Sequence, residues 1–434
     1  MNIGETLYSA GMRAAAPMLR LAAPLNERLR RAVAGRAASL ESLLNWASAE
    51  RAATRPLLWL HAPSVGEALM AQAILARVRA RRADVQAIFT FFSPSAERIA
   101  PRVGADWSGY LPWDTTPVLR RVLDAARPDC IAFVRSEIWP VLTREATERR
   151  ARVLLVNAVL AEDSSRIGAT ARMVLGPSYR RLHAIGAVSA DDAARFSVLN
   201  VLHERVHVTG DARFDQVAER VQSIDRSRAL LHSLLSHRGP WLVAGSTWRE
   251  DEERMISALA QLEPRGVKWR AIIAPHEPTR AHIEALEARL TAAKLSHAAL
   301  PHDDEAIHTN AAVLIVNRVG VLSELYAVAD TAYVGGGFGD QGLHSVVEPA
   351  ALGVPVLFGP KHGNAREAGR LAAAGGGHVV HTVVELRDTL ARWLRDESTR
   401  QRVGAAARAF VQSHTGGADT NAELIAGAFN PAVR

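Results

Sequence analysis

The chain has 434 residues, of which 48% are hydrophobic and 22% charged, a composition typical of a globular protein with room for two domains. The single cysteine, Cys130, excludes a disulfide framework and a cysteine-based zinc site, and no uncharged apolar run is long enough to predict a membrane span. The formal net charge of +7 fits a nucleic acid, an anionic lipid or a phosphorylated substrate as partner, but an arginine-rich composition alone would also produce it.

The first 40 residues differ from the rest because they combine small apolar residues with many arginines. Leucines such as Leu7 and Leu21 alternate with arginines such as Arg13 and Arg20. This pattern predicts a basic amphipathic helix, broken near its two prolines. Such a helix can lie on an anionic bilayer surface or pack on its own domain, and the sequence leaves both interpretations open.

From residue 57 onward, apolar runs of strand length alternate with segments of helical periodicity. We predict strands over residues 57–61, 85–91, 130–134, 153–157, 184–188 and 206–209. We predict helices over residues 68–80, 95–103 and 113–126. Alternation of this kind indicates a mostly parallel sheet with helices on both faces.

A second set of the same kind follows a helix and linker. Its predicted strands cover residues 241–245, 269–274, 313–316, 332–334 and 355–358. Its predicted helices cover residues 250–262, 279–293, 322–329, 345–352, 384–394 and 398–412.

The two sets predict an α/β protein with two doubly wound, Rossmann-like domains that face a central cleft. In such sheets, ligands bind beyond the carboxyl ends of the strands. We expect a basic segment over residues 1–40, an N-terminal domain over 41–215, a linker over 216–238 and a C-terminal domain over 239–434. The last helix can pack back on the N-terminal domain.

Residues 332–360 form the most informative stretch of the chain. A short apolar strand leads into four glycines between residues 335 and 339, and a predicted helix follows. Glycines allow a sharp turn and a close approach of a ligand to main-chain N–H groups, and a helix N-terminus attracts phosphate. We expect His344 and Glu348, four residues apart, to share one face of that helix. An ordinary strand-to-helix turn has the same pattern, and the spacing is neither a P-loop nor a dinucleotide fingerprint.

Several short motifs occur in a fixed order along the chain. They are HAPSVGE (61–67), LPWD (111–114), SEIWP (136–140), GDARFD (210–215), AGSTWREDE (244–252), APHEPTR (274–280), GVLSELYAVAD (320–330), GGGFGDQGLHSVVEP (335–349) and PVLFGP (355–360). Over about residues 57–380, this set resembles the 3-deoxy-D-manno-octulosonic acid (Kdo) transferases of lipid A biosynthesis.

The resemblance implies a GT-B glycosyltransferase of lipopolysaccharide biosynthesis, with CMP-Kdo as donor and a lipid A precursor (lipid IVA) as acceptor. It implies no cofactor, no metal ion and no nucleic-acid partner. It also implies a place at the cytoplasmic face of the inner membrane, with the N-terminal segment attached to the anionic membrane surface.

Two glutamates are the catalytic candidates. Glycosyl transfer to a hydroxyl needs a base that accepts its proton, and the resemblance assigns this role to Glu67, with inversion at the sugar. A glutamate in the first turn of a helix is also stabilised by the helix dipole alone. Glu137 follows a strand, where it would orient the acceptor or stabilise positive charge on the donor sugar. Ser64 and Gly66, just before Glu67, would contact the acceptor.

Two arginines complete the expected acceptor site. Arg135 stands where the family has an acidic residue, so it would contact a phosphate or a carboxylate instead. Arg213 stands where many members have lysine, and its alternative role is a surface salt bridge.

The resemblance assigns the donor to the C-terminal domain. The expected donor contacts are Ser246, Thr247, His276, Arg280, Gly320, Glu324, His344, Ser345 and Glu348. Ser246 and Thr247 would contact the donor phosphate, although both also fit a helix N-cap. The chain departs from the family pattern at Pro275, Leu343 and Ser345, where the family has arginine, glycine and asparagine.

Two other functions remain open. One is a different GT-B reaction, by a nucleotide-sugar transferase or epimerase with a UDP-sugar. The other is a catalytically inactive lipid-binding relative. The nature of the bound nucleotide and the presence of turnover distinguish them.

Overall fold

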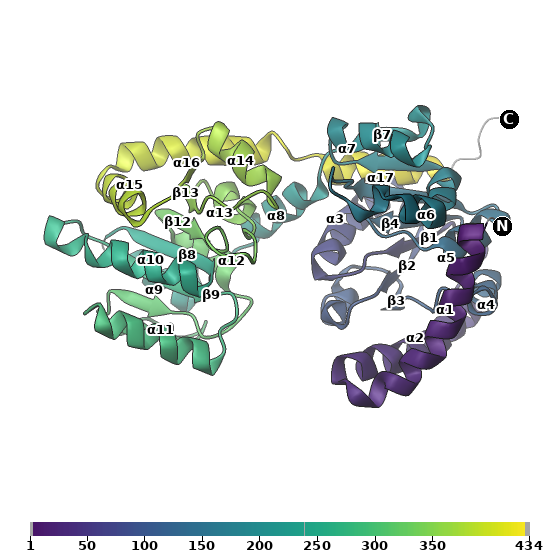
Figure 1. The fold of residues 1–434 in the computed structure, drawn as a ribbon, viewed down its shortest axis with the longest axis horizontal. Coiled ribbons are helices and arrows are strands. Elements are labelled where there is room, and N and C mark those ends of the chain that lie inside the picture. Colours follow the sequence, from purple (N-terminus) through teal and green to yellow (C-terminus); the bar gives the residue numbers. More distant parts are fainter. Residues whose placement is uncertain (1–2, 238, 430–434) are drawn as a thin grey trace. The chain divides into compact units, whose positions relative to one another are not determined.

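The computed structural model describes residues 3–237 and 239–429, with only the backbone described at residues 28 and 263, and it contains two compact units (Figure 1). Unit 1 contains the chain up to Gln216 together with the C-terminal segment from Thr415. Unit 2 contains Val217–His414.

Unit 1 is built on a seven-stranded sheet in which every neighbouring pair is parallel. Its strands are β1 (Leu57–His61), β2 (Gln86–Phe91), β3 (Trp107–Tyr110), β4 (Cys130–Val134), β5 (Arg152–Ala158), β6 (Ala184–Ala187) and β7 (Val206–Val208). Their order in the sheet is β3-β2-β1-β4-β5-β6-β7. The chain therefore moves outward in one direction from β1 and in the other from β4, and the turns that follow these two strands diverge.

Helices cover both faces of this sheet (Figure 1). One face is packed by α2 (Glu27–Ala49), α4 (Thr116–Ala126), α5 (Pro140–Glu148) and α6 (Ala169–Arg181). The other face is packed by α3 (Val65–Arg81) and α17 (Gly417–Ala428). Strands β1, β2 and β4 are buried on both faces, as expected of a parallel sheet between two helical layers.

The remaining helices of unit 1 are peripheral. They are α1 (Ile3–Ala22), which lies against α6, and α7 (Ala190–Arg195). The unit boundary falls inside α8 (Ala212–Gln222).

The C-terminal helix α17 is attached to unit 1 by buried polar groups. The main-chain N–H groups of Gly416 and Ala418 donate to the carboxylate of Asp215, at 2.7 and 2.9 Å. The side chain of Asn421 accepts from the N–H of Asn157 at 2.9 Å. The two bonds to Asp215 satisfy orphan N–H groups at the start of α17, so Asp215 acts as a cap from a distant part of the chain.

Unit 2 repeats the same architecture with a second parallel seven-stranded sheet. Its strands are β8 (Trp241–Thr247), β9 (Arg270–Pro275), β10 (His297–Ala299), β11 (Val313–Ile315), β12 (Thr331–Val334), β13 (Val356–Phe358) and β14 (Gly377–Val379). Their order is β10-β11-β9-β8-β12-β13-β14, so the direction reverses between β8 and β12.

Helices again form two layers. They are α9 (Ala229–Ser236), α10 (Arg249–Ala260), α11 (Arg280–Ala292), α12 (Leu322–Leu325), α13 (Val347–Ala351), α14 (Arg366–Ala373), α15 (Val383–Arg395) and α16 (Glu397–Gln412). Side chains of α10, α11 and α15 pack on one core, and those of α9 and α12 pack on the other. The predicted fold class, two doubly wound α/β sheets, is confirmed.

One sequence expectation about a single element is wrong, and two others hold only in part. Residues 95–103 form two short 3-10 turns instead of a helix, because Pro101 lacks an N–H group and blocks an α-helical turn. The helix expected over 345–352 begins only at Val347, so His344 precedes it. The basic segment is broken near Pro24, as expected, but its first helix continues through Pro17, and the second continues to Ala49. Within the described residues, no helix is long and apolar enough to cross a membrane.

Replacing Asp215 by alanine should lower the free energy of unfolding by about 2 kcal/mol, because two N–H groups at the start of α17 lose a charged acceptor. Urea unfolding measures the change. The control is Glu423→Ala, an exposed position on the same helix, for which we expect a change within about 0.5 kcal/mol. Equal effects of the two substitutions would contradict this role of Asp215.

Candidate functional site

The two glutamates predicted to be catalytic follow the two strands at which the unit 1 sheet reverses. Glu67 lies in the first turn of α3, directly after β1, and its carboxylate accepts a hydrogen bond from the Ser64 hydroxyl. Gly66 is exposed, and a Cβ atom there would meet no other atom within 4 Å. Glu137 follows β4, the neighbour of β1. The turns after adjacent parallel strands lie at the same sheet edge, as the sequence predicts.

Glu137 has one carboxylate oxygen, Oε2, that is buried and accepts no hydrogen bond from the described residues. Nε2 of His61 lies 3.6 Å from this oxygen. That Nε2 already accepts from the indole N–H of Trp139 at 3.2 Å. The His61 proton therefore belongs on Nδ1, where it donates to the hydroxyl of Thr90 at 3.0 Å. Glu137 thus keeps a buried acceptor that no donor of the described residues satisfies.

A buried arginine, Arg36 of α2, lies near Glu137. Its guanidinium stacks on the rings of Phe92, Trp113 and Tyr110, at 4.4, 5.1 and 5.3 Å from the ring centres. Burial lowers the pKa of Arg36, while the charges of Tyr110 and Glu137 act in the opposite direction. The N-terminal segment therefore places a cation, Arg36, near Glu137. The sequence did not predict this proximity.

Asp114, the aspartate of LPWD, is a structural anchor. Its carboxylate accepts the N–H groups of Val141 and Leu142 at 3.0 and 2.8 Å, in the first turn of α5. Burial raises the pKa of Asp114 to about 6, although these hydrogen bonds and one from Tyr8 oppose the rise. Tyr8 belongs to α1, so this helix is connected to the start of α5, just after Glu137.

The two arginines expected at the acceptor site converge on one carboxylate. Nη1 of Arg135 and Nη2 of Arg213 lie 3.3 and 3.4 Å from the same oxygen of buried Asp211. Burial alone would raise the pKa of Asp211, but the charges of Arg213 and Arg135 outweigh it, and the pKa is lowered. The amide of Asn157 donates to the other oxygen at 3.2 Å. Sequence analysis missed Asp211, although its place beside Arg213 in GDARFD was a signal.

In unit 2, the glycine-rich loop packs main chain against main chain. A Cβ atom on Gly335 would lie 2.3 Å from the carbonyl oxygen of Ser246, at the end of β8. Gly336 has a φ of +94°, and its Cβ would lie 2.0 Å from the carbonyl oxygen of Gly342. The N–H of Gly336 donates to Asp251 at 2.8 Å. The loop therefore needs its glycines to close against β8, whatever it binds.

Three rings stack at the edge where the unit 2 sheet reverses. Trp248 lies over His276, with ring centres 4.8 Å apart, and His276 lies over His344 at 4.3 Å. The indole N–H of Trp248 donates to Nε2 of His344 at 3.3 Å. Burial, and next the charge of His276, lower the pKa of His344 to about 4. At neutral pH, His344 is therefore an uncharged hydrogen-bonding group.

Thr247, an expected phosphate contact, is buried at the end of β8. Its hydroxyl donates to Oε1 of the buried Glu252 at 3.1 Å. Nε2 of His282 lies 2.8 Å from the same Oε1 of Glu252, and Nη1 of Arg289 donates to Oε2 at 2.7 Å. The Thr247 side chain is thus used inside the domain, and a ligand would meet the neighbouring Ser246, whose φ is +52°.

The other expected donor residues are more dispersed. Arg280 is 92% exposed and pairs with Glu284 at 2.7 Å. Glu324 pairs with Arg228 at 2.7 Å. Gly320 has a φ of +94° in the turn before α12.

Ser345 and Glu348 lie at α13. The hydroxyl of Ser345 accepts the N–H of Val347 at 3.3 Å. Glu348 lies on α13, where its charge adds to burial in raising the pKa of Tyr326. In the described part of the chain, no group of three or more His, Cys, Asp or Glu side chains is arranged to hold a metal ion.

Gly336→Ala should destabilise the protein by about 3 kcal/mol, because the new methyl group would overlap the Gly342 carbonyl at a left-handed φ. Gly363→Ala is the control, since its Cβ would meet nothing within 4 Å. Thermal unfolding compares the two. A Gly336 variant as stable as the Gly363 variant would show that the loop does not close as described.

The His344 ring should titrate near pH 4 in an NMR titration. Because its pKa is lowered on folding from 6.5, protonation opposes folding, and stability falls between pH 6.5 and about 4. In His276→Asn, the His344 pKa should rise only partly, since burial is the larger cause. A midpoint near 6.5 in the unsubstituted protein would contradict the burial of this ring.

Comparison with known proteins finds similarity to one family of transferases. A family model described as 3-Deoxy-D-manno-octulosonic-acid transferase (kdotransferase) matches residues 27–216. The 3-deoxy-D-manno-octulosonic acid transferase of Bordetella pertussis is 28% identical over 427 residues, covering 95% of this chain and 97% of that protein. The enzyme of the same name from Haemophilus influenzae is 23% identical over 377 residues, covering 85% and 86%.

Solved structures show the same fold in more distant proteins. A glycosyltransferase from Rickettsia africae has a TM-score of 0.57 and 11% identity, covering 87% of this chain and all of that chain. A putative UDP-N-acetylglucosamine 2-epimerase from Listeria monocytogenes has a TM-score of 0.59 and 12% identity, covering 85% and 94%. The fold is thus that of GT-B proteins, and the chain is similar to 3-deoxy-D-manno-octulosonic acid transferases, whose family model matches its residues 27–216.

Proposed function

We propose that this protein transfers Kdo from CMP-Kdo to a lipid A precursor, lipid IVA, with inversion at the sugar and with Glu67 as the general base. The observation that carries the proposal is the pair Glu67 and Glu137, which follow the adjacent strands β1 and β4 at the reversal of the unit 1 sheet. Similarity to the 3-deoxy-D-manno-octulosonic acid transferases supports Kdo as the transferred group and lipopolysaccharide biosynthesis as its setting.

The reaction is a single displacement. Glu67 accepts the proton of the acceptor hydroxyl as its oxygen bonds to the anomeric carbon of Kdo, and the bond from that carbon to the phosphate oxygen of CMP breaks with its electron pair. Attack on the face opposite the leaving CMP inverts the configuration. Positive charge develops on the sugar during the step, and the carboxylate of Glu137 stabilises it or holds the acceptor.

The acceptor is held by unit 1. Arg135 and Arg213, both braced by Asp211, present cationic groups suited to a phosphate of the acceptor or to the Kdo carboxylate. The open space around Gly66 lets the acceptor approach the backbone beside Glu67, and Ser64 orients the carboxylate. Each of these side chains also has an ordinary structural role inside unit 1.

The donor is held by unit 2. The His276 and His344 rings and the main chain of Ser246 lie at the reversal between β8 and β12, which is where nucleotides bind in doubly wound sheets. A neutral His344 would hydrogen-bond a phosphate or a hydroxyl without adding charge. Ser345 and Glu348 would receive the ribose hydroxyls. Arg280 and Glu324 would have to leave their present partners to reach the donor.

We also propose that α1 lies on the anionic surface of the inner membrane, on its cytoplasmic face. Exposed apolar side chains on and just after this helix include Ile3, Leu7, Met18, Leu21 and Leu25. Arg13 and Arg20 are exposed on the same helix. Apolar side chains and neighbouring arginines are the two components of interfacial binding.

A second function, transfer or epimerisation of a UDP-sugar, is favoured only by the fold of the structural neighbours. The two proposals differ in the nucleotide. A CMP-binding protein that does not bind UDP-N-acetylglucosamine supports the first.

Glu67→Gln should reduce the rate of Kdo transfer by about 10²- to 10⁴-fold, because the amide cannot accept the proton. Transfer from CMP-Kdo to a tetra-acylated lipid A precursor is followed by mass spectrometry. CMP binding by the variant should be unchanged, which shows that it is folded. Glu162→Gln, an exposed glutamate, is the control and should keep the full rate. Near-normal transfer by the Glu67 variant would overturn the assignment of the base.

A further inference from the structure

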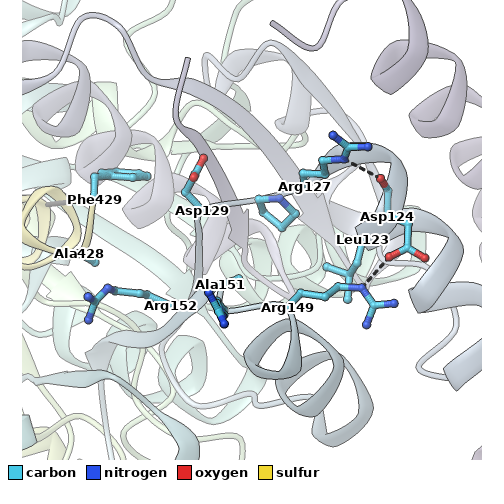
Figure 2. Close-up of a pocket in the computed structure, with 11 residues that line it drawn as sticks. Leu123, Asp124, Arg127, Asp129, Arg149, Ala151, Arg152, Ala428 and Phe429 are labelled. Atoms are coloured by element: carbon cyan, nitrogen blue, oxygen red, sulfur yellow. Dashed lines mark hydrogen bonds and ion pairs between the residues drawn. The ribbon is translucent and has the colours of Figure 1, made fainter. Parts of the chain in front are cut away.

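Unit 1 contains a cavity of about 650 Å³ at the sheet edge opposite to the two glutamates (Figure 2). It lies where β4 and β5 begin, whereas Glu67 and Glu137 follow the ends of β1 and β4. Four arginines line it, namely Arg127, Arg149, Arg150 and Arg152. Phe429, just after α17, closes one side. Neither the proposed donor nor the proposed acceptor uses any of these residues.

Two carboxylates, Asp124 and Asp129, also line the cavity. Neither forms an ion pair with Arg127, Arg150 or Arg152. Asp124 pairs with Arg149 at 2.7 Å. Asp129 accepts the N–H of Leu57 at 2.7 Å and lies 3.7 Å from Arg51.

The remaining three arginines form no ion pair within the described part of the chain. Arg127 donates only to the main-chain oxygen of Asp124, at 3.2 Å, as Figure 2 shows. Arg152 contacts the ring of His183. No hydrogen bond is recorded for the side chain of Arg150, which is exposed. The cavity therefore has an excess of positive charge.

Two of these arginines, Arg127 and Arg150, have a left-handed backbone conformation. Arg127 ends α4 with a φ of +51°, and Arg150 follows the end of α5 with a φ of +64°. Helices commonly end in this left-handed conformation, but on glycine, because other residues adopt it only at a cost. The helix dipole favours a cation anywhere in the last turn and does not require it at the left-handed position. The two turns lead into the adjacent strands β4 and β5. In each turn, an arginine occupies a position where the backbone conformation favours glycine.

We propose that this arginine pocket binds an anion that carries phosphate groups. The guanidinium group forms paired hydrogen bonds with phosphate oxygens, and arginine is the side chain best suited to them. The volume admits a molecule with at least two phosphate groups, and Phe429 offers an apolar wall. A soluble phosphorylated compound and the headgroup of an acidic phospholipid both present this chemistry, and the experiment separates them.

The test uses the full chain and the double variant Arg127→Gly, Arg150→Gly. Glycine suits both left-handed positions, so the melting temperature should stay the same or rise while two phosphate contacts are lost. The matched control, Arg102→Gln with Arg121→Gln, removes the same charge from exposed positions outside the cavity. The two probes are inorganic pyrophosphate, by calorimetry, and vesicles of phosphatidylglycerol compared with phosphatidylcholine, by co-sedimentation.

We expect the double glycine variant to lose affinity by about tenfold or more for one probe, while CMP binding and the control variant stay unchanged. Loss of pyrophosphate binding identifies a soluble ligand, and loss confined to phosphatidylglycerol vesicles identifies a lipid headgroup. The proposal is overturned if neither probe binds the unsubstituted protein, or if the glycine and control variants bind equally well.

Discussion

The hydrogen-bonding of β1 beside β4, in parallel, is the constraint on which the candidate site depends. Because the chain leaves these two strands in opposite directions, the turns after them diverge and leave room at the sheet edge. Glu67 and Glu137 occupy these two turns. The same arrangement of β8 beside β12 places Ser246 and the glycine-rich loop together in unit 2. The two sheets thus follow the same topological rule, and each has one candidate binding edge.

Buried carboxylates hold the turns of these edges in place. Asp114 fixes the start of α5, Asp211 braces two arginines, and Asp251 accepts the N–H of Gly336. Each satisfies main-chain or cationic donors inside the protein, where an unpaired donor would be costly. These aspartates of the sequence motifs therefore support the candidate site, and the candidate catalytic groups are the two less constrained glutamates, Glu67 and Glu137.

The sequence was sufficient to predict the alternating strands and helices, since buried parallel strands are continuous apolar runs. It failed at residues 95–103, where Pro101 prevents a helix, and at short edge strands such as β14. It also could not predict that Arg36 lies near Glu137, because only the packing of α2 brings them together. Long-range contacts of this kind leave no local pattern. Burial of single motif residues was equally hidden from the sequence. Thr247 was expected to contact a phosphate, but its side chain is buried.

The central claim is the identity of the transferred group. The most direct measurement is the reaction of the unsubstituted protein with CMP-Kdo and a tetra-acylated lipid A precursor, followed by mass spectrometry. The account predicts a lipid product heavier by one Kdo residue, or by several, with release of CMP in equal amount. A protein that binds CMP but forms no such product would contradict Kdo transfer to this acceptor, and one that turns over a UDP-sugar instead would contradict the assignment of the donor.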